Sequence, residues 1–176
     1  MQNTLDKVIA CLKFLELNPN MEQYEWRFLT QKIAFLAKAL GMDIDYCFTI
    51  YVAGPYSREL NLDYYPFENK ERINSLQTDY DLTPSDIEVL EKIKRCCDIY
   101  NNKDLMESTS TIVFFTKENP NLTDDNLFAK LKLLKPHLSD YNSVIGISKA
   151  KELLFKPEYL TNAIRREMEE WDRFDH

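Results

Sequence analysis

The chain has 176 residues, of which 44% are hydrophobic, and this length suffices for one domain with a sizeable core. Its formal net charge of −7 disfavours a strong, unspecific nucleic-acid binder, because such proteins usually carry a basic surface. No apolar run approaches the length of a membrane span, so a membrane partner is not expected.

Two helices are predicted before the first strand. Over residues 4–17 the apolar side chains fall on one helical stripe. Residues 22–40 form a longer and more apolar helix that is closed by Gly41, with Gln31 and Lys32 as its polar interruptions. We expect this second helix to be buried on most sides.

The next stretch combines strand and turn chemistry, and we expect the chain to be organised around it. Residues 46–53 are rich in β-branched and aromatic types, with apolar side chains on both faces, which predicts a strand covered on both sides. Gly54 permits a positive φ and Pro55 fixes its own φ, so a sharp turn is expected. Ser57 then caps a helix over residues 58–65.

This corner has two interpretations, a structural turn or a recognition surface. From residue chemistry alone the structural interpretation is favoured, because Gly and Pro are first of all turn residues. The recognition interpretation rests on Tyr and Arg side chains, which are common binding anchors. The residues of this candidate recognition corner are Gly54, Pro55, Tyr56, Ser57, Arg58, Asn61, Tyr64 and Tyr65.

Helices dominate the rest of the chain. The polar segment 67–80 favours no element, and a second strand is considered around residues 76–82. Further helices are predicted over residues 84–100, 104–117, 124–135, 140–154 and 157–171. We therefore expect a mainly α protein with a small β element.

Residues that carry chemistry are sparse. The four cysteines show no Cys-x-x-Cys spacing and follow no signal peptide, so we expect a cytoplasmic protein with reduced, buried thiols. The three glycines are too widely spaced for a phosphate-binding loop. His137 is the single internal histidine and is expected to be hydrogen-bonded or exposed. We therefore expect no catalytic residue, no metal and no cofactor, and an enzyme is the least favoured class.

One stretch of the chain, residues 130–156, is clearly basic. Only Asp140 and Glu152 offset its lysines there. A solvated face is the favoured interpretation, and binding to an acidic protein or a nucleic acid is the alternative. The candidate basic patch consists of Lys130, Lys132, Lys135, Lys149 and Lys151, followed in sequence by Lys156.

Several of these segments together resemble a known family. The motifs are Arg27-Phe-Leu-Thr-Gln-Lys32, Tyr46-x-Phe48, Tyr51-x-x-Gly54-Pro55-Tyr56-Ser57-x-x-Leu60, Tyr80-Asp-Leu-Thr83, Glu107-Ser-Thr-Ser-Thr-Ile112 and Leu134-Lys-Pro-His-Leu-Ser139. In this arrangement the chain resembles the YwgA-like proteins of bacteria and archaea over about residues 4–155. That family is similar in style to Panacea domains, which resemble the SocA antitoxin.

The resemblance implies a fold and a function. Length predicts a single domain over residues 1–176, and the resemblance implies a winged-helix-like half, 1–101, with a C-terminal helical bundle, 102–176, packed on it. It also implies a non-catalytic interaction module, antitoxin-like or an adaptor. The expected partner is then a protein, either a toxin or a second copy of the chain.

The alternative is a winged-helix DNA-binding regulator. In that case Arg58 and Asn61 read a groove, and the later lysines hold phosphate. Acidic residues outnumber basic ones between Arg58 and Lys103, which disfavours phosphate anchoring. The sequence therefore favours a protein partner over DNA.

Overall fold

A computed structural model describes residues 4–97 and 101–155. Within these ranges the chain forms eight helices and one two-stranded antiparallel hairpin, which confirms the prediction of a mainly α protein with a small β element. The elements in chain order are α1 (Thr4–Phe14), α2 (Tyr24–Ala39), β1 (Thr49–Tyr51), β2 (Gly54–Tyr56), α3 (Arg58–Tyr64), α4 (Phe67–Asn74), α5 (Pro84–Cys96), α6 (Lys103–Glu118), α7 (Asp124–Leu134) and α8 (Asp140–Leu154).

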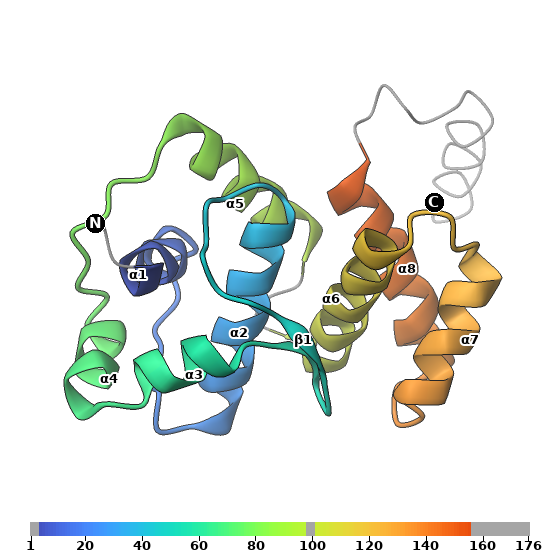
Figure 1. Ribbon diagram of the computed structural model, residues 1–176, viewed down its shortest axis with the longest axis horizontal. Helices are drawn as coiled ribbons and strands as arrows, with labels where there is room; N and C mark the ends of the chain where they lie inside the picture. The colour runs from blue at the N-terminus through green and yellow to red at the C-terminus, as the bar shows by residue number, and fades with distance from the viewer. Residues whose placement is uncertain (1–3, 98–100, 156–176) are drawn as a thin grey trace.

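The hairpin lies between two groups of helices. In Figure 1, α1 to α5 occupy one side of the molecule, and α6, α7 and α8 occupy the other. Strand β2 contacts both α2 and α6, and these two helices also contact each other. Buried apolar residues from both groups form one cluster. The hairpin is therefore fixed at the junction of the two groups.

The hairpin turn depends on Gly54. The strands close at the pair Tyr51–Gly54, which leaves Val52 and Ala53 as the connecting residues. Two-residue hairpin turns of types I′ and II′ need a positive φ at a central residue, and neither Val52 nor Ala53 has one. The positive φ, +88°, lies on Gly54 instead, where a glycine bulge residue follows a turn. The predicted positive φ of Gly54 is thus confirmed.

Two predictions about the strands are wrong. The strand expected over residues 46–53 is limited to Thr49–Tyr51, and its two outer residues are exposed, so it is not covered on both sides. Its partner is the segment Gly54–Tyr56, directly after the turn, and residues 76–82 form no strand. A local partner needs little loop closure, which explains why the hairpin forms here.

The helix ends follow capping chemistry. Ser57 caps α3 as predicted, because its Oγ accepts a hydrogen bond from the backbone N–H of Leu60. Thr83 forms a capping box with Asp86 at the start of α5. At the end of α2, Gly41 adopts a φ of +113° and the chain closes in a Schellman motif.

Helix α4 lies within the polar segment for which the sequence favoured no element. Its first residue, Phe67, is exposed, and only Ile73 is buried, so the segment lacks an apolar stripe. Its position is fixed by tertiary contacts. Arg72 pairs with Asp6 of α1, and Asn69 donates a hydrogen bond to the backbone of α3.

None of the helices in residues 4–97 and 101–155 combines the length and hydrophobicity of a membrane span. The helix predicted over residues 157–171 lies outside these ranges, as do residues 98–100 of the helix predicted to end at residue 100.

We predict that Gly54→Ala destabilises the protein more than Gly41→Ala. Both glycines have a positive φ, which costs an alanine about 1–3 kcal/mol. At Gly54 the new Cβ would also lie 2.8 Å from the side chain of Thr111, whereas at Gly41 it would meet nothing within 4 Å. Urea unfolding of the two variants measures the difference, and equal losses of stability would contradict a packed hairpin.

Candidate functional site

Two buried lysines hold the hairpin by its carbonyl oxygens. Lys32 on α2 donates a hydrogen bond to the backbone oxygen of Pro55 at 2.7 Å. Lys135, which follows α7, donates to the backbone oxygen of Tyr51 at 2.6 Å and also to that of Val52. Both lysines are only 2% exposed. Each buried ammonium therefore finds a hydrogen-bond acceptor in the hairpin backbone.

Glu107 on α6 supplies the opposite charge. Its side chain is buried, with Oε1 3.5 Å from Nζ of Lys135 and Oε2 3.2 Å from Nε2 of His137. Within the described ranges Oε1 accepts no hydrogen bond. We call Lys32, Glu107 and Lys135 the hairpin clamp. It sets two ammonium groups against one carboxylate.

Burial controls the protonation of the clamp. Desolvation lowers the pKa of Lys32 to about 7, and nearby Lys135 lowers it as well, while Glu107 acts to raise it. Desolvation also lowers the pKa of Lys135, against the opposing effect of Glu107. Near neutral pH, Lys32 therefore exists in both its charged and its neutral form.

Gln31 fixes the end of the hairpin that leads into α3. Its Nε2 donates to the backbone oxygen of Ser57 at 2.9 Å, and its Oε1 accepts from the backbone N–H of Ser57 at 2.8 Å. This pairing satisfies both buried backbone groups of Ser57. Both polar interruptions of α2 thus hold the corner.

A hollow of about 360 Å³ opens beside the hairpin, between α2 and α3. Five aromatic rings, two cations and the two amides of Gln31 and Asn61 contribute to its walls. We call it the corner hollow, and its main lining residues are Tyr24, Arg27, Phe28, Lys32, Tyr51, Tyr56, Asn61 and Tyr64. No acidic residue of the described chain lines it. The corner hollow is therefore aromatic and positively charged.

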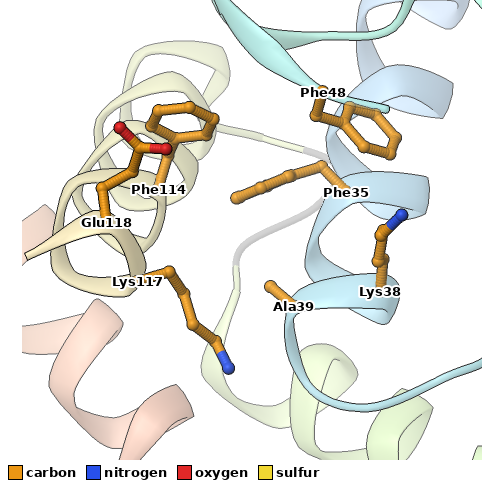
Figure 2. A pocket seen from close by; sticks show the side chains of 7 residues that line it. All are labelled: Phe35, Lys38, Ala39, Phe48, Phe114, Lys117 and Glu118. Atoms are coloured by element: carbon orange, nitrogen blue, oxygen red, sulfur yellow. The ribbon is translucent and has the colours of Figure 1, made fainter. Parts of the chain in front are cut away.

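A second hollow, of about 320 Å³, lies between α2 and α6. Figure 2 shows its three phenylalanine rings, with Phe35 between Phe48 and Phe114. The ring centroids lie 5.5 Å and 5.9 Å apart, so these rings pack against one another. The charges of Lys117 and Glu118 at its edge are exposed and of opposite sign. This hollow holds no residue of the candidate recognition corner.

The structure brings half of the candidate recognition corner to the corner hollow. Four of its residues line the hollow: Gly54, Tyr56, Asn61 and Tyr64. Pro55 and Ser57 are buried, and their backbones are held by α2. Arg58 and Tyr65 are exposed and lie outside the hollow lining.

The candidate basic patch is not one free surface. Lys135 is buried in the hairpin clamp, because its ammonium bonds to the hairpin carbonyls, so its assignment to a surface patch is corrected. Each of the other four lies against a ring or a carboxylate. These contacts are Lys130 with Phe115, Lys132 with Asp140, Lys149 with Glu152 and Lys151 with Asp124. Lys156 lies outside the described residues.

The clamp could not be recognised from the sequence pattern. Lys32 was noted as a polar interruption in an apolar helix and as part of a family motif, and Glu107 only as part of another such motif. A charged residue in an otherwise apolar stretch requires a buried partner, and this requirement was the available indication. Nothing in the sequence shows that the partners are hairpin carbonyls.

Three of the four cysteines are buried, but Cys47 is exposed, so the expectation of buried thiols is wrong for Cys47. Burial raises the pKa of Cys11 and of Cys97 to about 12, which disfavours their reactive thiolate forms. His137 is half exposed and contacts Glu107, as expected for a hydrogen-bonded histidine. Residues 4–97 and 101–155 contain no cluster of three potential metal ligands.

Comparisons of the chain with models of protein families, with curated proteins and with solved structures found no match.

We predict that Lys135→Met destabilises the protein by about 3–5 kcal/mol, because it leaves the buried Glu107 without its ammonium partner. Lys149→Met is the control, since it removes a partly exposed ion pair that is worth less than about 1 kcal/mol. Urea unfolding at pH 7 measures both losses. A loss for Lys135→Met as small as that of the control would rule out a structural role for the clamp.

We predict a pH dependence of stability that Lys32→Met removes. The pKa of Lys32 is about 7 in the folded protein and has an ordinary value of 10.5, so the unfolded chain binds more protons between these values. The contribution of Lys32 to the free energy of unfolding therefore rises with pH in this window, by up to about 1.4 kcal/mol per pH unit.

Urea unfolding between about pH 7.5 and 9.5 compares the wild type with Lys32→Met. Lys38→Met, which changes an exposed lysine of the same helix, should keep the wild-type dependence. Parallel curves for the wild type and Lys32→Met would show that burial does not disfavour the charged form of Lys32.

Proposed function

We propose that the protein is a non-catalytic interaction module that presents the β1–β2 corner to a partner protein. One observation carries this proposal. The side chains of Tyr51 and Val52 are 63% and 76% exposed, while Lys135 holds their carbonyl oxygens from the buried side. We call the hairpin turn at Tyr51 and Val52 the tip. Because the tip is held in one conformation, it loses little conformational entropy when it binds a partner.

Exposed apolar side chains continue from the tip along the chain. Leu62 and Tyr65 on and after α3, and Phe67 at the start of α4, are all more than half exposed. Single exposed apolar residues are ordinary, but their recurrence over residues 62–67 supports the proposal of an interaction site near the corner. The exposed Arg58 adds a charged donor, and Tyr and Arg are frequent hot-spot residues.

The resemblance to YwgA-like proteins favours the same class of function. Panacea-type domains, which are similar in style, are associated with toxin neutralisation by direct contact or as adaptors. We therefore propose an antitoxin-like or adaptor role, with a toxin protein as the partner. A second copy of the chain is the other protein partner that this role allows.

The alternative proposal is a winged-helix DNA-binding regulator in the cytoplasm, with Arg58 and Asn61 on α3 as the base-reading residues. Two observations make this function less favoured than protein binding. No strand forms over residues 76–82, and α3 carries the acidic residues Glu59 and Asp63 beside Arg58. Acidic side chains on a recognition helix repel DNA phosphates.

We predict that Tyr51→Ser and Arg58→Ala each weaken partner capture about tenfold or more, as expected for hot-spot residues, without loss of stability. The measurement is a pull-down of the tagged protein from its native host, with and without nuclease, read by mass spectrometry. Tyr141→Ser is the matched control for Tyr51→Ser, because Tyr141 is similarly exposed but lies on α8.

The proposal requires one protein that survives nuclease, that the control still captures, and that both corner variants lose. Equal capture by all three variants would contradict the corner as the binding surface. Recovery of nucleic acid, with protein partners lost after nuclease and binding that falls steeply with salt, would favour the DNA-binding alternative.

A further inference from the structure

We propose that the corner hollow binds a small aromatic carboxylate, with the acid group paired to Lys32 and the ring among the aromatic side chains. Ligand binding there would be a separate property of the protein, because it needs no partner protein, although the tip residues Tyr51 and Val52 form part of the wall of the hollow.

Lys32 feels the charge of Glu107 but forms no direct ion pair within the described chain. Its ammonium donates to the backbone oxygen of Pro55 and lies 4.8 Å from the ring centroid of Phe28. No carboxylate of the described chain lies within 4 Å of it. An ammonium has three donors, and a buried charge requires compensation. A carboxylate in the hollow would supply both a further acceptor and a direct ion-pair partner.

Arg27 provides a second cation on the same wall. Its Nη1 donates to the backbone oxygens of Met21 at 2.9 Å and of Glu22 at 2.7 Å, which holds the guanidinium in place. Within the described ranges, its Nε and Nη2 donate no hydrogen bond, so they remain free for a ligand. A fixed guanidinium with spare donors suits recognition of a carboxylate.

The walls and the volume of the hollow favour an aromatic ring as the part of the ligand that carries the acid group. Aromatic side chains dominate the lining, and they stack favourably on a planar ring. The volume of about 360 Å³ is at the lower end of the usual range of about 300–1,000 Å³ for ligand sites. It suits one ring with a short acid rather than a dinucleotide. With only two lining cations, a triphosphate is also disfavoured.

Protonation of Lys32 gives binding a characteristic pH dependence. The charged groups that act on Lys32 are Glu107 on α6 and Lys135 after α7, while Arg27 lines the same hollow from α2. The pKa of Lys32 is about 7 in the free protein, and a bound carboxylate would raise it. Affinity should therefore fall as the pH rises above 7, by up to about tenfold per pH unit.

The test titrates the purified full chain with phenylacetate and with its neutral analogue phenylacetamide, followed by ¹⁵N amide shifts. At about pH 6.5, where the carboxylate is ionised, we expect phenylacetate to bind about tenfold or more tightly than the amide. The largest shifts should fall on Gly54 and on the side-chain amide of Asn61, both of which line the hollow.

Two variants test whether the preference for the acid over the amide depends on the two cations of the hollow. Lys32→Met should abolish the preference for the acid, and Arg27→Gln should reduce it at least about threefold. Lys130→Met is the control, because this lysine lies over a ring outside the hollow and should leave the preference unchanged. The comparison of acid with amide in the wild type needs no variant, so it holds even where a variant fails to fold.

Three results would overturn the proposal. The first is the absence of shifts with either compound at millimolar concentration. The second is equal affinity for acid and amide, or a preference that survives in Lys32→Met. The third is binding of the peptide Gly-Gly-Tyr, through its terminal carboxylate, about tenfold more tightly than phenylacetate, since this would assign the hollow to a protein chain end.

Discussion

Burial of two ammonium groups is the constraint on which the centre of this structure depends. Lys32 and Lys135 can be buried only where acceptors meet them, and the hairpin carbonyls supply those acceptors. The hairpin in turn has only three residues in each strand, and an isolated hairpin of this kind is marginally stable in water. Hairpin and lysines are therefore mutually dependent, and Glu107 reduces the electrostatic cost of holding both charges in the interior.

The clamp joins segments that are far apart in sequence. It takes one side chain from α2, one from α6 and one from the residue after α7. The two lysines bond to the backbone of the hairpin, and Glu107 contacts Lys135. Figure 1 shows the hairpin beside α2 and α6. The conformation of the exposed tip is thus set by the packing of both helical groups. The corner hollow shares Lys32 with the clamp, so a ligand there would act on the same charge that holds the hairpin. Tip, clamp and hollow form one connected region of the molecule.

Sequence reasoning succeeded where the chemistry is local. The positive φ of Gly54 and the cap formed by Ser57 follow from residue type and position alone, and both are present. It failed where contacts decide the outcome. Helix α4 lacks an apolar stripe and depends on tertiary contacts such as that between Arg72 and Asp6. Lys135 was assigned to a surface patch because it lies in a stretch of sequence rich in lysine, but its side chain is buried. A one-dimensional pattern does not show that a carbonyl 84 positions away will bury that ammonium.

The measurement that tests this account most directly is the backbone ¹⁵N order parameter of Val52 and Ala53 at neutral pH. A clamp that holds the tip predicts values of about 0.85, equal to those in the middle of α2, although both residues are at least partly exposed in a turn. Values below about 0.6 would describe a flexible loop. They would contradict the clamp as the support of the corner, and with it the pre-organised surface proposed for the partner protein.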